Sequence, residues 1–123
     1  MRIVRLATTL TLATALATTL VACTVRPALT FSPEALPDGA VGQPYSVAIS
    51  IGANQTPVGD IYAEGALPPG LALPFDRNAP SSTATLSGTP TEAGTYQLTI
   101  SAWCLGTNVS GQTGSHQYTI VVR

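Results

Sequence analysis

The chain has 123 residues, of which 45% are hydrophobic and 9% are charged, and it contains no lysine. Its formal net charge is −1 at pH 7, and without clustered basic residues a nucleic-acid interface is excluded. Its 10 prolines and 11 glycines exclude a mainly helical protein.

The N-terminal segment has the parts of a bacterial export signal. Arg2 and Arg5 precede an uncharged run that ends in Leu20-Val21-Ala22-Cys23. This tetrapeptide resembles the lipobox of bacterial lipoproteins, and the resemblance implies cleavage before Cys23 and acylation of that cysteine. We therefore expect a signal peptide over residues 1–22. The alternative is an ordinary secretory signal, cut near Ala22, that leaves Cys23 available for a disulfide.

Residues 23–29 are expected to form a short lipidated tether, followed by one folded domain over residues 30–123. The roughly 100 residues after Cys23 are enough for one domain and too few for two. Loss of Arg2 and Arg5 leaves more carboxylates than arginines, so attraction to an acidic membrane surface is not expected. Attachment then depends on acyl chains, and two or more of them hold a protein stably on a bilayer.

Short segments with strand-like sequence follow one another along the domain. Residues 45–51 and 94–102 alternate most clearly between apolar and polar side chains, a period of two that predicts strands with one buried face. Trp103 lies on the opposite face from Ala102 unless a bulge turns it inward, and the pattern allows both. The other expected strands are residues 28–32, 58–64, 83–87 and 116–122.

Two turn segments, residues 65–73 and 86–96, separate several of these strands. Proline restricts φ to about −65° and glycine accepts positive φ, so both residues fix tight corners. The residues given this structural role are Pro68, Pro69, Gly70, Gly88, Pro90 and Gly94. Short strands joined by such corners predict an all-β, two-sheet antiparallel sandwich, with a barrel as the alternative.

Residues 67–73, 86–90 and 93–100 resemble the He_PIG family of bacterial Ig-like repeats, which are related to cadherin-like and dystroglycan-type Ig domains. The resemblance covers about residues 36–122. It implies an Ig-like sandwich of about seven strands in an exported or cell-surface protein, and it implies that the Tyr96 hydroxyl bonds back to the main chain. The chain departs from the family in carrying one copy, and in having Ala102-Trp103-Cys104-Leu105 where relatives often carry an aspartate.

The sequence does not favour an enzyme. His116 is the one histidine, and the sequence has no Gly-x-Ser-x-Gly, His-Glu-x-x-His or Cys-x-x-Cys motif. Calcium needs six to eight oxygen ligands, and the candidates Asp38, Asp60 and Asp76 are scattered along the chain. We therefore expect no cofactor, with calcium as the alternative.

Cys104 and three aromatic residues allow more than one interpretation. If Cys23 is acylated, Cys104 is a free thiol that acts as a small buried hydrophobe or forms an intermolecular disulfide; otherwise it pairs with Cys23. Trp103, Tyr62 and Tyr45 either pack in the core or form an aromatic platform for a sugar.

The longest polar loop, residues 105–115, is the expected binding surface, with Asn108, Ser110 and Gln112 as candidate contacts. We expect a non-enzymatic binding or structural module, lipid-anchored in a bacterial cell envelope, with a protein or glycan partner. Thr24, in place of aspartate after the cysteine, favours the outer membrane of a two-membrane bacterium by resemblance to enterobacterial lipoproteins. The alternative is a small secreted lectin-like domain that binds calcium or carbohydrate.

Overall fold

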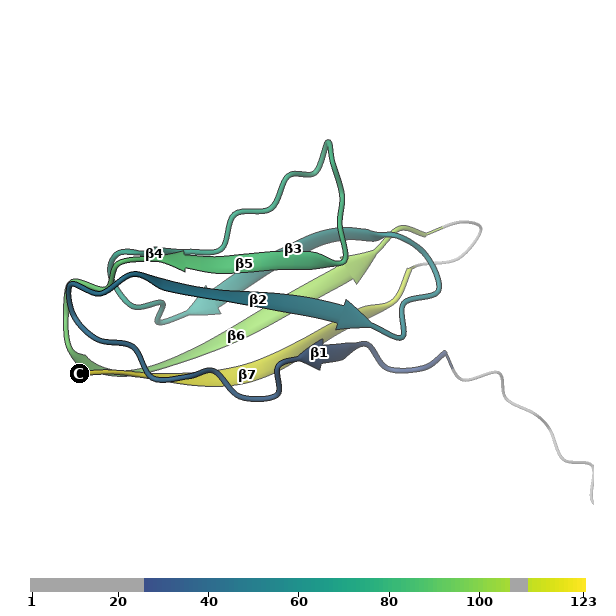
Figure 1. Ribbon diagram of the computed structural model, residues 1–123. Coiled ribbons are helices and arrows are strands. Elements are labelled where there is room, and N and C mark those ends of the chain that lie inside the picture. The colour runs from purple at the N-terminus through teal and green to yellow at the C-terminus, as the bar shows by residue number, and fades with distance from the viewer. Residues whose placement is uncertain (1–25, 107–110) are drawn as a thin grey trace, which may run out of the picture.

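The computed structural model describes residues 26–106 and 111–123, in which it contains seven strands and no helix. The strands are β1 (Thr30–Ser32), β2 (Tyr45–Gly52), β3 (Val58–Gly65), β4 (Leu71–Ala72), β5 (Thr83–Gly88), β6 (Gly94–Cys104) and β7 (Thr113–Val122). They form two antiparallel sheets that pack face to face (Figure 1), with strand orders β1-β2-β5-β4 and β3-β6-β7.

This strand order is that of a constant-type immunoglobulin sandwich. The predicted all-β, two-sheet antiparallel architecture is therefore confirmed. The barrel alternative is wrong, because the two sheets remain separate. The connection between β1 and β2 runs beside the end of β7, where Gly39 makes a parallel bridge to Val122.

The core lies between the sheets and is formed by the inward half of each alternating strand. Five of its residues expose 1% or less of their surface: Ile49, Ile61, Leu86, Ile100 and Ile120. Each fully buried side chain of this size contributes about 1.5–3 kcal/mol to folding. The alternation of apolar and polar residues in β2 and β6 thus determines which face of each sheet is turned toward the core.

Three strands differ from the expected ranges. The two-residue strand β4 lies inside a segment that the sequence indicates as a turn, and it exists because Leu71 pairs with Gly88. β6 continues to Cys104 and β7 starts at Thr113, since Trp103 and Thr113 still pair across the ladder. The bulge near Trp103 is in the neighbouring strand, between Val58 and Asp60, so Trp103 keeps its outward direction.

The two predicted corners contact each other, backbone against backbone. The Thr89 amide donates to the Gly70 carbonyl oxygen (3.2 Å), and the Thr91 amide donates to the Pro69 carbonyl oxygen (3.0 Å). A Cβ atom at Gly70 would lie 2.0 Å from the Thr89 carbonyl oxygen, and one at Gly88 would lie 2.0 Å from the Gly70 carbonyl oxygen. Both positions therefore require glycine.

Three tyrosine hydroxyls tie two connections to the sandwich, the one between β5 and β6 and the one between β1 and β2. Tyr96 donates to the Glu92 carbonyl oxygen (3.0 Å), which is the geometry of the tyrosine corner in Ig-like folds. Tyr45 donates to the Pro37 carbonyl oxygen (2.9 Å) and Tyr118 to that of Pro33 (2.7 Å). The bonds of Tyr45 and Tyr118 hold the long connection between β1 and β2 against the sheets.

Candidate functional site

Three of the predicted site residues lie outside the described part of the chain: Cys23, Asn108 and Ser110. The remaining candidates are described below. Among residues 26–106 and 111–123, no helix is long and apolar enough to span a membrane.

Gln112 has a different environment from the one expected of a binding-loop residue. Its side chain is buried, and in the described part of the chain its amide group bonds to backbone atoms of three other residues. Its Oε1 accepts from the Gln55 amide (2.7 Å), while its Nε2 donates to the carbonyl oxygens of Pro27 (2.8 Å) and Ala53 (3.0 Å). Gln112 thus joins the start of the domain, the connection between β2 and β3, and the start of β7.

Each of the three calcium candidates has another partner. Asp60 is buried on β3 and forms an ion pair with Arg77. Asp38 pairs with Arg123 at 3.1 Å near the C-terminus. Asp76 Oδ1 accepts from the Asn78 amide (2.9 Å) within a turn. Within the described ranges, no three His, Cys, Asp or Glu side chains are grouped to hold a metal ion.

Cys104 is a buried free cysteine at the end of β6, with 3% of its surface exposed. Burial raises the pKa of its thiol above the ordinary value of 9.0, so the neutral form prevails at physiological pH. A thiol that is both buried and neutral is a poor nucleophile. This environment suits the interpretation of Cys104 as a small core residue.

His116 is held by its neighbours on β1 and β7. Its Nε2 donates to the Glu34 carbonyl oxygen (2.9 Å), and its ring lies 4.5 Å from the ring centre of Tyr118. Phe31 stacks against it at 6.0 Å. These contacts give His116 a packing role at the edge of the core.

Two of the three aromatic residues considered as a sugar platform are exposed. Tyr45 is buried in the core, whereas Tyr62 and Trp103 lie on the outer face of the β3-β6-β7 sheet. The Trp103 ring covers Gly59, where an added Cβ would lie 2.2 Å from a ring carbon. Because Gly59 has no side chain, the indole ring can pack directly on the backbone of β3.

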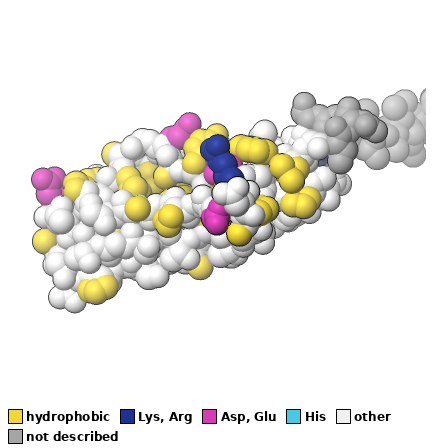
Figure 2. Space-filling view, turned by 90° about the horizontal axis from the view of Figure 1, so that it is seen from above, with side chains coloured by type: hydrophobic (Ala, Val, Ile, Leu, Met, Phe, Trp, Pro, Cys, Tyr) yellow, Lys and Arg dark blue, Asp and Glu magenta, His cyan; other side chains and the backbone are white. Residues whose placement is uncertain are grey.

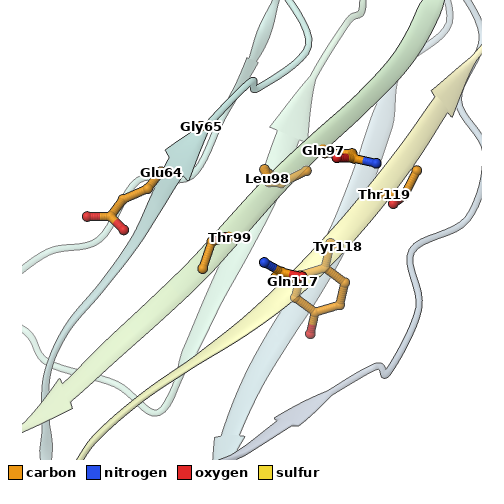
Figure 3. Close-up of a pocket in the computed structure, with 8 residues that line it drawn as sticks. All are labelled: Glu64, Gly65, Gln97, Leu98, Thr99, Gln117, Tyr118 and Thr119. Atoms are coloured by element: carbon orange, nitrogen blue, oxygen red, sulfur yellow. The ribbon is translucent and has the colours of Figure 1, made fainter.

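A shallow polar groove of about 350 Å³ crosses the same outer face. Figure 3 shows its polar side chains, which come from β3, β6 and β7. Strand pairing places Thr99 between Glu64 and Gln117, and places Gln97 beside Thr119. Leu98 and Tyr118 also line the groove, but their side chains are in the core.

The groove is lined mainly by uncharged polar side chains, and Glu64 is its one carboxylate. Its hydroxyl and amide groups can each donate and accept hydrogen bonds, and the Glu64 carboxylate accepts them. Among the described residues that line the groove there is no lysine, arginine or histidine. It therefore suits a partner rich in hydroxyl or peptide groups better than an anionic one.

The surface around the β4–β5 connection, residues 73–82, also carries few charges. Figure 2, which looks onto this connection, shows hydrophobic and uncharged polar side chains around a contact between basic and acidic groups. The pair of Arg77 and Asp60 joins the connection to β3. Arg77 remains largely exposed, whereas Asp60 is covered.

Comparisons with known proteins agree with this fold. Residues 27–123 match the family described as Putative Ig domain (He_PIG). Among solved structures, a variant of the SrpA adhesin from Streptococcus sanguinis is 17% identical (TM-score 0.57), and the similarity covers 81% of this chain and 57% of the adhesin chain. An endo-fucoidan hydrolase of glycoside hydrolase family 107 is 25% identical (TM-score 0.55), over 77% of this chain and 16% of the hydrolase.

The chain thus spans little more than half of the adhesin structure and a small part of the hydrolase. No match was found among curated proteins. The family match covers most of the chain, and the strand order, the paired glycine corners and the Tyr96 bond agree with it. The chain belongs to the Putative Ig domain family.

Proposed function

We propose that this protein is a lipid-anchored, non-enzymatic binding module of a bacterial cell envelope. Acyl chains on Cys23 hold it on the membrane, and Thr24 favours the outer membrane where the bacterium has two. The Ig-like sandwich presents the outer face of the β3-β6-β7 sheet to a protein or glycan partner. Membership of an Ig-like family and the fold shared with an adhesin support the role as a binding module.

The observation that carries the proposal is the position of the lipobox relative to the folded domain. Leu29 is the first core residue, and about five residues separate it from Cys23. An extended chain spans at most about 3.6 Å per residue, so the tether reaches about 20 Å. A domain with so short a connection to an acylated cysteine stays next to the bilayer.

A glycan is the second candidate partner, and the exposure of Tyr62 and Trp103 favours it. Their rings lie on the same face as the amide and hydroxyl groups of the groove. Aromatic faces stack on sugars, while amides and hydroxyls bond to sugar hydroxyls. Binding of a sugar panel by the wild-type protein, and its loss in Tyr62→Ala, would distinguish a glycan from a protein partner.

The two cysteines allow a matched test of the anchor. We expect Cys23→Ala to lose incorporation of a labelled fatty acid and to leave the membrane fraction, because its acylated side chain is gone. Cys104→Ala should remain labelled and membrane-bound. Labelling of the Cys23→Ala protein at the wild-type level would refute the anchor.

The binding face is tested by two exposed threonines, one on each sheet. Thr119 lies in the groove, and Thr85 lies on the outer face of β5 in the other sheet. We expect Thr119→Arg to reduce cross-linking of envelope partners in whole cells, because it fills the groove with a cation. Thr85→Arg should leave cross-linking unchanged. Equal effects of the two variants would argue against the groove.

A further inference from the structure

The domain begins at one identifiable end of the sandwich. Pro27 is joined through Gln112 to Ala53, and Leu29 lies against Gly114 at the start of β7. Figure 1 shows that β1 starts at the end where β2 and β6 finish. We call this the tether end and define it by residues 26–29, 52–57, 103–106 and 111–113.

The tether end also carries exposed apolar side chains. Leu105 exposes 43% of its surface and Trp103 exposes 37%. The Leu105 main chain is fixed on both sides, because its amide donates to the Pro57 carbonyl oxygen (2.9 Å) and its carbonyl oxygen accepts from the Thr56 hydroxyl (2.7 Å). Because the Trp103 ring packs on Gly59, both exposed side chains are held in fixed positions at this end.

The charges at the tether end are compatible with a bilayer surface. The residues that define it include Arg26 and no carboxylate. Asp38, by contrast, lies beside Arg123 at the opposite end. Asp60, which lies nearest in β3, is paired with Arg77. An indole ring beside an aliphatic side chain is typical of proteins at the headgroup level, where one side is apolar and the other is wet.

We infer that the tether end rests on the bilayer that holds the anchor, with Leu105 and Trp103 in the headgroup region. This inference depends on the proposed acylation of Cys23. The tether of about 20 Å keeps this end within reach of the membrane. β6, with its 11 residues, extends about 36 Å away from it.

This orientation changes which surfaces are available to a partner. Residues 105–106 and 111–113, which belong to the loop first expected to bind a partner, lie at the membrane side. The groove begins about 13 Å further from the bilayer, because Thr99 precedes Trp103 by four residues along β6. The groove, Tyr62 and the end near Arg123 therefore remain accessible, whereas Trp103 in the headgroup region no longer contributes to a glycan site.

Trp103 is the one tryptophan of the chain, so its fluorescence reports directly on this contact. The acylated mature protein, which begins at Cys23, is reconstituted in phosphatidylcholine vesicles, with and without bromine atoms on the upper part of the lipid acyl chains. We expect a blue-shifted emission and loss of most of the intensity in the brominated vesicles, because bromine quenches on contact. A reporter at the opposite end, Val41→Trp combined with Trp103→Phe, should not be quenched.

Leu105 and Val41 provide a matched pair, since they are almost equally exposed at 43% and 44%. Leu105→Ser should weaken the quenching of Trp103, whereas Val41→Ser should not. Unquenched Trp103 in protein whose mass shows acyl chains would overturn the inference and leave the proposed anchor intact. A blue shift that increases with the protein-to-lipid ratio, without quenching, would overturn it in favour of a second copy. A protein mass that shows no acyl chains would refute both this inference and the proposed anchor.

Discussion

Replacing Gly88 by alanine is expected to destabilise the protein more than any substitution that only changes backbone preference. Gly88 has a φ of 138° and lies against Gly70, so a methyl group there meets a carbonyl oxygen at 2.0 Å. The neighbouring atom belongs to the backbone of a turn that is bonded at Thr89 and Thr91. It cannot move away without breaking those bonds.

Gly42 provides the control, because alanine at this position has an unfavourable positive φ but no steric clash. Its φ is 75°, and no atom lies within 4 Å of the position of an added Cβ. Gly42→Ala should therefore cost about 1 kcal/mol, the usual penalty of a left-handed conformation. In Gly88→Ala, the steric clash costs about 1–3 kcal/mol in addition. The free energy of unfolding of this variant should therefore be about 3 kcal/mol lower than that of the wild-type protein.

Urea unfolding of the full-length protein, followed by far-ultraviolet circular dichroism, measures both values. For a domain of this size, each 1 kcal/mol corresponds to a loss of about 4–8 °C in Tm, which gives a second measurement. A Gly88→Ala variant as stable as Gly42→Ala would show that the two corners do not contact each other as described.

Three further predictions concern side chains. Gln112→Leu should lower the free energy of unfolding by about 2 kcal/mol, because it leaves backbone groups at the tether end without partners; the groove variant Gln117→Leu should have little effect in the same urea experiment. Tyr96→Phe should cost about 1 kcal/mol through loss of one hydrogen bond, and an unchanged urea midpoint would contradict this. The folded-state pKa of Cys104 is raised from 9.0, so its contribution to stability is complete below that pH and is lost as the pH rises through the raised value. Cys104→Ala should therefore show a weaker fall in stability at alkaline pH.

The strands that alternate clearly could be predicted from the sequence. In β2 and β6, apolar residues at every second position indicate both the strand and its buried face, because side chains point to opposite faces in turn. β4 gives no such signal, since two residues are too few for a period. It forms only because distant residues of β5 bring a partner to it.

The site was less predictable than the fold. A polar glutamine in a polar loop indicates exposure, yet Gln112 is buried because three separate segments converge on its amide. The groove depends on strand register across the sheet, which local sequence does not determine. Gly59 did carry a usable signal, because a glycine within a strand often marks a close approach, and here the approaching group is Trp103.

The most direct test of the lipid-anchored module is the intact mass of the protein purified from the membrane of its own host, measured with and without reductant. We predict a monomeric chain that begins at Cys23, carries added acyl mass, and does not change on reduction because Cys104 is a free thiol. A soluble, unacylated chain that gains two protons on reduction would contradict the account, since Cys23 would then be joined to Cys104.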